Sequence, residues 1–245
     1  PSTDGIDIDS STNILIENCI IDCNDDIICL KAGRDADGLR INRPTENVLI
    51  RNCTAHRGAG LITCGSETSG GIRNVLAYDL KAIGTSVVLL LKSAMTRGGT
   101  IENIYVTQVE AENVRRIFGA DPNWNPKYSY STLPEIYKNK EIPEHWKVML
   151  TPVTPPEKGF PHFRNIYLSQ VKATNVQEFI SASGINDSLR LENFYLHAIE
   201  AQVQKAGTIR FTQNFNATGV KLEVPTPHSM LLEENAQDNI KIEYV

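Results

Sequence analysis

Three aspartates near the start of the chain have the residue type and spacing of acid and base catalysts. Asp4 precedes a short apolar strand pattern, and Asp25 and Asp26 stand side by side before the next such pattern. If each pattern forms one strand of a coil, the carboxyl groups lie on neighbouring coils, because adjacent strands are about 4.8 Å apart. Carboxyl groups that share a site have pKa values pushed apart, so one acts as an acid and another as a base. This arrangement could cleave a glycosidic bond.

Turn formation is the competing explanation for these aspartates. A short carboxylate bonds to its own backbone and tolerates tight bends, so a single Asp beside Gly or Asn needs no further function. The conjunction of all three acids with strand patterns on both sides favours a shared site.

A repeated phrase, an asparagine followed by an alternating apolar strand, organises the chain. Turn residues separate the strands and helical periodicity is lacking, which favours parallel strands stacked coil on coil. We therefore predict an all-β fold, a right-handed parallel β-helix forming a single domain over residues 1–245. Because a solenoid needs a capped end and no amphipathic helix precedes the first strand, we expect N-terminal coils to be missing. The repeated asparagines, which we expect to form a ladder, are Asn13, Asn47, Asn74, Asn103, Asn165 and Asn193.

One interval between strands differs in composition and predicts a loop insertion at about 119–163. It holds most of the prolines, both tryptophans and several other aromatic residues. Long ordered loops on a rigid scaffold frequently carry function. Since flat aromatic faces suit the apolar faces of sugar rings, Trp124 and Trp146 are candidate sugar contacts. Packing of these rings against the flank of the solenoid is the alternative.

Composition excludes several classes of protein. The chain has 245 residues, of which 41% are hydrophobic and 22% charged, with a net charge of −5. These values exclude general disorder and leave no electrostatic footprint for nucleic acid. No apolar run is long enough to span a bilayer, and no signal peptide is visible. The five cysteines form no metal-like pair, so we expect them to be reduced residues of the wall.

The order of the motifs resembles the pectin-cleaving glycoside hydrolases of the polygalacturonase and rhamnogalacturonase family, glycoside hydrolase family 28. The resemblance covers residues 1–110 by motif and the rest by repeat pattern. The motifs that carry it are Thr3-Asp4-Gly5, Asp25-Asp26, Gly58-Ala59-Gly60 with Gly65-Ser66-Glu67, and Lys92 followed by Arg97-Gly98-Gly99.

The resemblance implies an inverting hydrolysis without metal or cofactor. By motif, Asp25 matches the general acid that protonates the leaving oxygen, and Asp4 and Asp26 match the residues that hold and deprotonate the attacking water. Lys92 matches a residue that binds a substrate carboxylate, and Arg97 belongs to the same motif. Lys31 and Arg34, in a turn that resembles the expanded turn of exo-acting members, could add a local basic patch. A solvated lysine and a surface ion pair of Arg34 are the alternatives.

Two positions depart from the family pattern. Ala59 replaces a histidine that supports the acid and the bound sugar, and Leu90 replaces an arginine that clamps a galacturonate carboxylate. The resemblance therefore implies a pectin hydrolase that acts where galacturonate meets rhamnose or at chain ends, with endo or exo action left open. The implied partner is an acidic plant cell-wall polysaccharide, and we expect a monomer that is secreted or periplasmic, with no nucleic-acid or membrane partner.

Two other functions fit the same fold. A calcium-dependent polysaccharide lyase would need clustered acids to hold the ion, and the candidates are Asp4, Asp7, Asp9, Asp22, Asp25 and Asp26. Against this, the ordered hydrolase motifs have no explanation in a lyase. A non-catalytic carbohydrate-binding β-helix is the third possibility, favoured by the replacements at Ala59 and Leu90.

Overall fold

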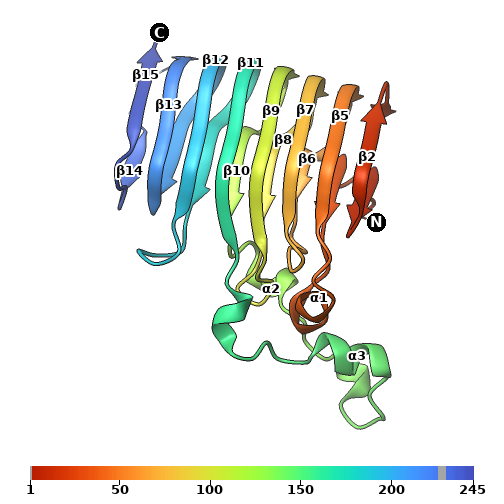
Figure 1. Ribbon diagram of the computed structural model, residues 1–245. Coiled ribbons are helices and arrows are strands. Elements are labelled where there is room, and N and C mark those ends of the chain that lie inside the picture. The colour runs from red at the N-terminus through yellow and green to blue at the C-terminus, as the bar shows by residue number, and fades with distance from the viewer. Residues whose placement is uncertain (1, 226–229) are drawn as a thin grey trace.

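The chain forms a right-handed parallel β-helix, as predicted, in a computed structural model that describes residues 2–225 and 230–245. The strands lie side by side and succeed one another along the axis of the solenoid, and the short helices gather at one edge (Figure 1). Every pairing between the named strands is parallel. No helix of the described part is long and apolar enough to cross a membrane.

Two rows of strands meet at the long strand β11 (His162–Ser183). One row has the order β1-β4-β6-β8-β10-β11, and its members are β1 (Ile6–Asp9), β4 (Ile28–Lys31), β6 (Gly58–Cys64), β8 (Thr85–Lys92) and β10 (Arg116–Asp121). The second row has the order β2-β5-β7-β9-β11, and its members are β2 (Thr12–Glu17), β5 (Thr45–Ala55), β7 (Ile72–Ile83) and β9 (Thr100–Glu112). The remaining strands extend the helix or flank it: β3 (Ile20–Ile21), β12 (Leu191–Arg210), β13 (Thr212–Glu223), β14 (Leu231–Glu233) and β15 (Asn239–Tyr244).

Alternating side chains build the core inside the coil. In β5 and β7 every buried position faces inward, and in-register partners stack apolar residue on apolar residue from one coil to the next. One such column is made by Ile28, Ile62, Leu89, Phe118 and Ile180, all of them fully buried. Burial of these columns stabilises each coil only through its neighbours, which is the usual energetics of a solenoid.

The expected asparagine ladder is confirmed. Each asparagine has a left-handed backbone, which Asn tolerates better than other residues with a β-carbon, and marks the corner at which the strand bends. Its side-chain amide donates to the asparagine of the preceding coil, at 3.3 Å from Asn74 to Asn47 and 3.2 Å from Asn103 to Asn74. Beside the ladder, the rings of Tyr105, Tyr167 and Tyr195 stack with centroids 4.5 and 4.8 Å apart.

The Pro-rich excursion leaves the solenoid after β10 and returns at β11, so the ends of the segment predicted at about 119–163 are strand residues. Between them lie α2 (Pro126–Ser129), α3 (Glu144–Met149) and two turns of 3-10 helix, Glu135–Tyr137 and Pro156–Gly159. A further short helix, α1 (Asp35–Ile41), forms in the expanded turn after β4 and contacts α3. The sequence predicts a loop in the excursion and an expanded turn after β4, and the structure adds these short helices to both.

The five cysteines lie in the coil wall as expected. All are free; Cys19 is half-buried and the other four are buried. Burial raises the pKa of the Cys64 thiol to about 12, so it stays protonated and unreactive.

Candidate active site

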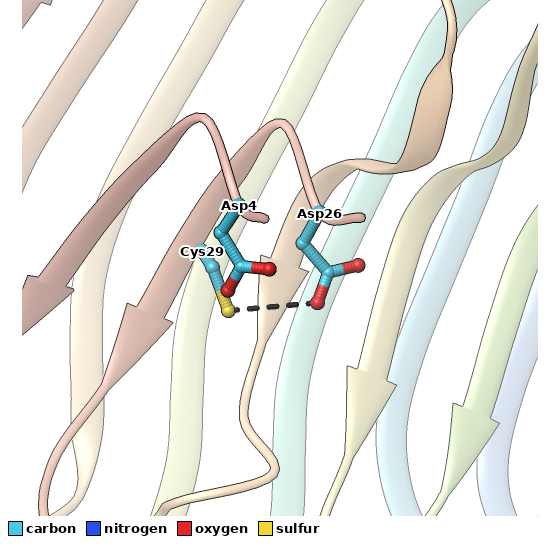
Figure 2. Close-up of side chains that lie close together, drawn as sticks. All are labelled: Asp4, Asp26 and Cys29. Carbon is cyan, nitrogen blue, oxygen red and sulfur yellow. Dashed lines mark hydrogen bonds between the residues drawn. The ribbon is translucent and has the colours of Figure 1, made fainter. Parts of the chain in front are cut away.

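Asp4 and Asp26 occupy equivalent positions on neighbouring coils. β1 pairs with β4 so that Ile6 lies opposite Ile28, and the Gly5 amide donates to the Asp26 carbonyl at 2.8 Å. Figure 2 shows both carboxylates projecting in the same direction, with the thiol of Cys29 beside Asp4 and within hydrogen-bond reach of Asp26 Oδ2 at 3.7 Å. One ligand atom from each of these three side chains lies within 4.8 Å of the other two. The stacking inferred from sequence therefore brings two of the three predicted catalytic acids together.

Asp25 faces the same cleft. The cleft has a volume of about 330 Å³. Asp25 is half-buried, and its carboxylate takes no hydrogen bond or ion pair from another side chain in the described part of the chain. The lining residues are Ser2, Asp4, Asp25, Asp26, Lys31, Gly65, Ser66, Glu67, Lys92, Trp124, Asn125 and Tyr128. All three predicted catalytic residues thus open onto one small volume.

Asp26 is the most firmly held of the three acids. It is 2% exposed, and its Oδ2 accepts a hydrogen bond from Lys92 Nζ at 2.7 Å. Its Oδ1 accepts hydrogen bonds from Thr63 Oγ1 at 2.9 Å and from the Gly60 amide at 3.0 Å. Burial lowers the pKa of Lys92, but the charge of Asp26 and the hydrogen bond to it together outweigh burial, and the pKa is raised overall. Three donors therefore fix the orientation of this carboxylate.

Asp4 has a different environment. Lys31 Nζ lies 2.9 Å from Asp4 Oδ2 and 2.8 Å from Asp7 Oδ1. Burial raises the pKa of Asp4, and the hydrogen bond from Lys31 only partly offsets this. Burial lowers the pKa of Lys31, but its hydrogen bonds to Asp7 and Asp4 outweigh burial and raise it overall. A carboxylate with a raised pKa accepts a proton more readily at working pH, which suits a general base.

The cluster of Asp4, Asp26 and Cys29 is poorly suited to a metal ion. The ammonium groups of Lys31 and Lys92 already contact the two carboxylates. Burial, with the nearby charge of Asp26, raises the pKa of Cys29 well above its ordinary value, and its Sγ donates to the Gly65 carbonyl at 3.1 Å. Ammonium groups paired with both carboxylates repel a cation.

The other acids considered for a calcium site are spread out. Asp7 pairs with Lys31, Asp22 pairs with Arg57 at 3.1 Å, and Asp9 accepts the Gly33 amide at 3.0 Å. None of these three lines the cleft. The six acids therefore do not converge as calcium ligands.

Trp124 and Tyr128, from the excursion, form an aromatic wall of the cleft. Lys92 Nζ lies 4.5 Å from the centroid of the Trp124 ring, and the rings of Trp124 and Tyr128 meet edge to face at 5.7 Å. Trp146 does not line this cleft. It lies on α3 and its ring packs near Tyr137 at 6.5 Å. A sugar contact of Trp146 therefore stays a prediction, at a position outside this cleft.

Arg97 is corrected from a substrate contact to a structural cation. It is 1% exposed, and its guanidinium donates to the carboxylate of Asp35 and to the carbonyls of Ser129 and Ser66. Ser129 ends α2, so Arg97 fastens the excursion that carries Trp124 to the coil. Because the guanidinium is buried, it does not reach a sugar bound in the cleft.

Arg34 serves the same attachment instead of a basic patch. Its Nε lies 3.0 Å from Asp35 Oδ2, and its Nη2 donates to Ser131 Oγ at 2.8 Å and to the Ser129 carbonyl at 3.1 Å. Arg34 does not line the cleft. The structure contains the ion pair of Arg34 with Asp35, which was the alternative to a basic patch.

The sequence analysis missed the groups that hold Asp26. Gly60, the last residue of the Gly58-Ala59-Gly60 motif, has no room for a side chain, since a β-carbon would lie 2.0 Å from Thr63 Oγ1. Thr63 lies opposite Cys29 in the β4–β6 register, with its side chain on the outer face of the strand. The sequence did contain a signal for Thr63: it is a polar residue at an outward-facing position of the strand that follows Asp26 by one coil.

A larger cavity than the cleft lies elsewhere, in a groove of about 720 Å³ across β7, β9, β11 and β12. It follows the corners where these strands bend at left-handed residues such as Gln108 and Gln170. Its lysines and glutamates alternate from coil to coil, and Lys81 pairs with Glu110 at 3.0 Å. The carboxylate cluster, not the size of a cavity, therefore identifies the candidate site.

The chain is similar to known proteins over about its first half. Residues 1–127 match the family described as glycosyl hydrolases family 28. A protein named "Probable polygalacturonase" from Vitis vinifera is 36% identical over 136 residues, which are 52% of this chain and 28% of that protein. The polygalacturonase of Ralstonia nicotianae is 34% identical over 125 residues, which are 49% of this chain and 22% of that protein.

A solved structure is similar over almost the whole chain. The exopolygalacturonase of Thermotoga maritima matches 98% of this chain and 44% of its own, with a TM-score of 0.64 and 25% identity. The chain thus spans less than half the length of each of these relatives.

Proposed function

The chain belongs to glycosyl hydrolases family 28, and from this premise we propose that it hydrolyses glycosidic bonds of galacturonate-containing pectin, with inversion and without a metal. One observation carries the proposal: Asp4 and Asp26 lie in register on neighbouring coils, and Asp25 opens onto the same cleft. This trio supplies the acid and the base that glycoside hydrolysis needs.

The environments of the three carboxyl groups suggest their roles. Asp25, which is free of side-chain partners among the described residues, is the general acid that protonates the leaving oxygen. Asp26, held by Thr63, Gly60 and Lys92, positions the attacking water. Asp4, whose pKa is raised by burial, shares that water and removes its proton. The water attacks the anomeric carbon on the face opposite the leaving oxygen, so the configuration inverts.

Reducing-sugar release tests the proposal. Polygalacturonate and rhamnogalacturonan are compared as substrates of the wild type and of Asp25→Asn, with a chelator present throughout. We expect chelator-insensitive release that falls by at least about a thousandfold in the variant, since an essential acid contributes to every turnover. Asp22→Asn is the matched control, because Asp22 pairs with Arg57 outside the cleft.

The product anomer tests inversion separately. Proton NMR during the first minutes of hydrolysis distinguishes the anomer formed first, and the retained anomer would refute the inverting mechanism. The preferred polymer decides between a polygalacturonase-like enzyme and a rhamnogalacturonan hydrolase.

A carbohydrate-binding β-helix is the second candidate. Two positions favour it, because neither has a side chain that could bind substrate. One is Ala59, in the motif whose Gly60 amide holds Asp26, and the other is Leu90, on the outer face of β8 beside Lys92. Binding of either polymer with no release by the wild type would support this candidate. Release of unsaturated products that stops with chelator would support a lyase instead. We propose that the protein acts outside the cell or in the periplasm, because pectin is an extracellular polymer. We further propose that it is a monomer.

A further inference from the structure

Two free cysteines, Cys19 and Cys53, stack on neighbouring coils at the start of the solenoid. We propose that they form a disulfide by exchange with a small disulfide such as oxidised glutathione, and that this bond ties the first coil to the second. Neither cysteine lines the cleft, so the pair acts independently of the proposed hydrolysis.

Strand register places the two cysteines opposite each other. β3 pairs with β5 so that Ile20 lies opposite Thr54, and the Thr54 amide donates to the Cys19 carbonyl at 2.8 Å. The asparagine that precedes each cysteine is joined to its counterpart by a side-chain hydrogen bond of 2.6 Å. Hydrogen bonds on both sides therefore fix Cys19 and Cys53 as an in-register pair.

The geometry of this pair suits a disulfide. Neighbouring strands are about 4.8 Å apart, and disulfides join Cα atoms about 4.4–6.8 Å apart. Both side chains point inward, since Cys53 belongs to the core and Cys19 packs against it. The thiols also have matching orientations: each Sγ donates to the carbonyl two residues earlier, at 3.3 Å in Cys19 and 3.2 Å in Cys53. Forming the bond thus needs side-chain rotation and no change of register.

The surroundings of the two thiols set the order of attack. Burial raises the pKa of the Cys53 thiol, and the adjoining Cys19 thiol adds to the rise. Cys53 is 2% exposed, whereas Cys19 is half-buried and is the thiol that a small disulfide reaches. Cys19 is therefore the attacking thiol and Cys53 the resolving one.

The exchange consists of two substitutions at sulfur. The Cys19 thiolate attacks one sulfur of oxidised glutathione, forms a mixed disulfide and releases one glutathione thiolate. The Cys53 thiolate then attacks Cys19 Sγ and releases the second. The two protein thiols are oxidised by two electrons in all, and the glutathione disulfide is reduced to two thiols. The extracellular or periplasmic setting proposed above supplies such oxidants.

The other three cysteines of the described chain are placed differently. Cys29 has Asp7 and Thr63 as its register partners, and Cys64 has a leucine on each side. Cys23 lies outside the strands, and its Sγ donates to a carbonyl two residues later at 3.3 Å. Register therefore favours the bond between Cys19 and Cys53 over links to the other thiols.

The bond would close a loop that is one coil long and contains Asp25 and Asp26. A disulfide across a loop of this length restricts the unfolded chain, so the thermal midpoint should rise by about 5 °C or more on oxidation and return when a dithiol reductant is added. An unchanged or lower midpoint in the cross-linked protein would overturn the stapling role.

Thiol mapping of the native chain tests the bond itself. The reduced protein is treated with oxidised glutathione and then unfolded in iodoacetamide, and its peptides are identified by mass spectrometry. We expect a linked peptide pair that carries Cys19 and Cys53, with the other three cysteines alkylated. Alkylation of both residues, glutathione retained on Cys19, or links to the other cysteines would overturn the inference.

Three variants test the order of attack. Cys53→Ser removes the resolving thiol, so Cys19 should retain glutathione as a mixed disulfide, and Cys19→Ser should leave Cys53 unmodified. Cys64→Ala is the matched control, because Cys64 is fully buried outside the pair, and it should form the same linked peptides as the wild type. Glutathione on Cys53 in the Cys19→Ser protein would overturn the assigned order. The mapping of the wild type decides the bond whether or not these variants fold.

Discussion

The hydroxyl of Thr63 is expected to hold Asp26 for catalysis, and Thr63→Val tests this with almost no change of volume. Thr63 is fully buried and donates to Asp26 Oδ1 at 2.9 Å. Valine removes only the donor. Asp26 Oδ1 keeps the Gly60 amide and Oδ2 keeps Lys92, so the carboxylate does not lose all of its partners.

The size of the effect follows from one hydrogen bond. A hydrogen bond to a charged group contributes about 1.5–3 kcal/mol, and the retained donors place this one at the lower end. A loss of about 1.5 kcal/mol in the transition state corresponds to roughly a tenfold fall in kcat/KM. Because the lost bond orients a carboxylate that acts on water, the fall should appear in kcat and leave KM nearly unchanged.

Steady-state kinetics on the preferred polymer, with Thr63→Ser as the rescue variant, provide the assay. Serine keeps the hydroxyl, so its kcat should stay within about threefold of wild type while valine loses the full amount. Thermal unfolding of all three proteins separates a catalytic effect from a loss of folding. Equal kcat for the valine and wild-type proteins, or equal losses for valine and serine, would refute the positioning role.

Three further predictions concern the attachment of the excursion, the pH dependence and the ladder. Arg97→Met removes a buried guanidinium from Asp35 and two carbonyls, so urea unfolding should show a loss of about 3–5 kcal/mol, whereas Arg40→Gln at an exposed ion pair should lose less than about 1 kcal/mol. Because burial raises the pKa of Asp4, the folded chain binds the proton of this carboxyl group more tightly than the unfolded chain does. The free energy of unfolding should therefore fall as pH rises from the ordinary aspartate pKa through the raised one. Asp4→Asn should remove this pH dependence when unfolding is measured over the same pH range. Asn103→Ala loses two ladder bonds and puts alanine, which tolerates a left-handed backbone less well than asparagine, at the corner. Chemical denaturation should therefore show a loss of about 1–3 kcal/mol, and an unchanged midpoint would contradict the ladder's role.

The features that repeat along the chain could be predicted from sequence. Each asparagine of the ladder recurs at a corner of the coil, so the amino-acid pattern itself reports the stacking. Asp4 and Asp26 precede equivalent strands, and strand equivalence places them together once parallel coils are accepted. Periodicity is a strong signal because each coil repeats the same local physics.

The features that occur once could not be predicted in this way. The contact of Arg97 with Ser129 joins a turn after β8 to the end of α2, and nothing repeats to reveal it. The position of Arg97 in its motif predicted a cation that binds substrate. Whether Arg97 is buried depends instead on how the excursion folds back over the coil. Thr63 depends on an exact register between β4 and β6, which single-sequence patterns do not fix.

The buried Arg97 also determines how a polymer can enter. Its guanidinium joins Ser66, on the coil side of the cleft, to Ser129, on the aromatic side. Opening this wall like a lid would break the ion pair of the buried Arg97 with Asp35 and its hydrogen bonds to the carbonyls of Ser66 and Ser129, which opposes such a motion. We infer that the cleft keeps its width without a closing motion. If the proposed function holds, a sugar chain would enter a slot that is already formed, and turnover should show no gating step on the millisecond timescale.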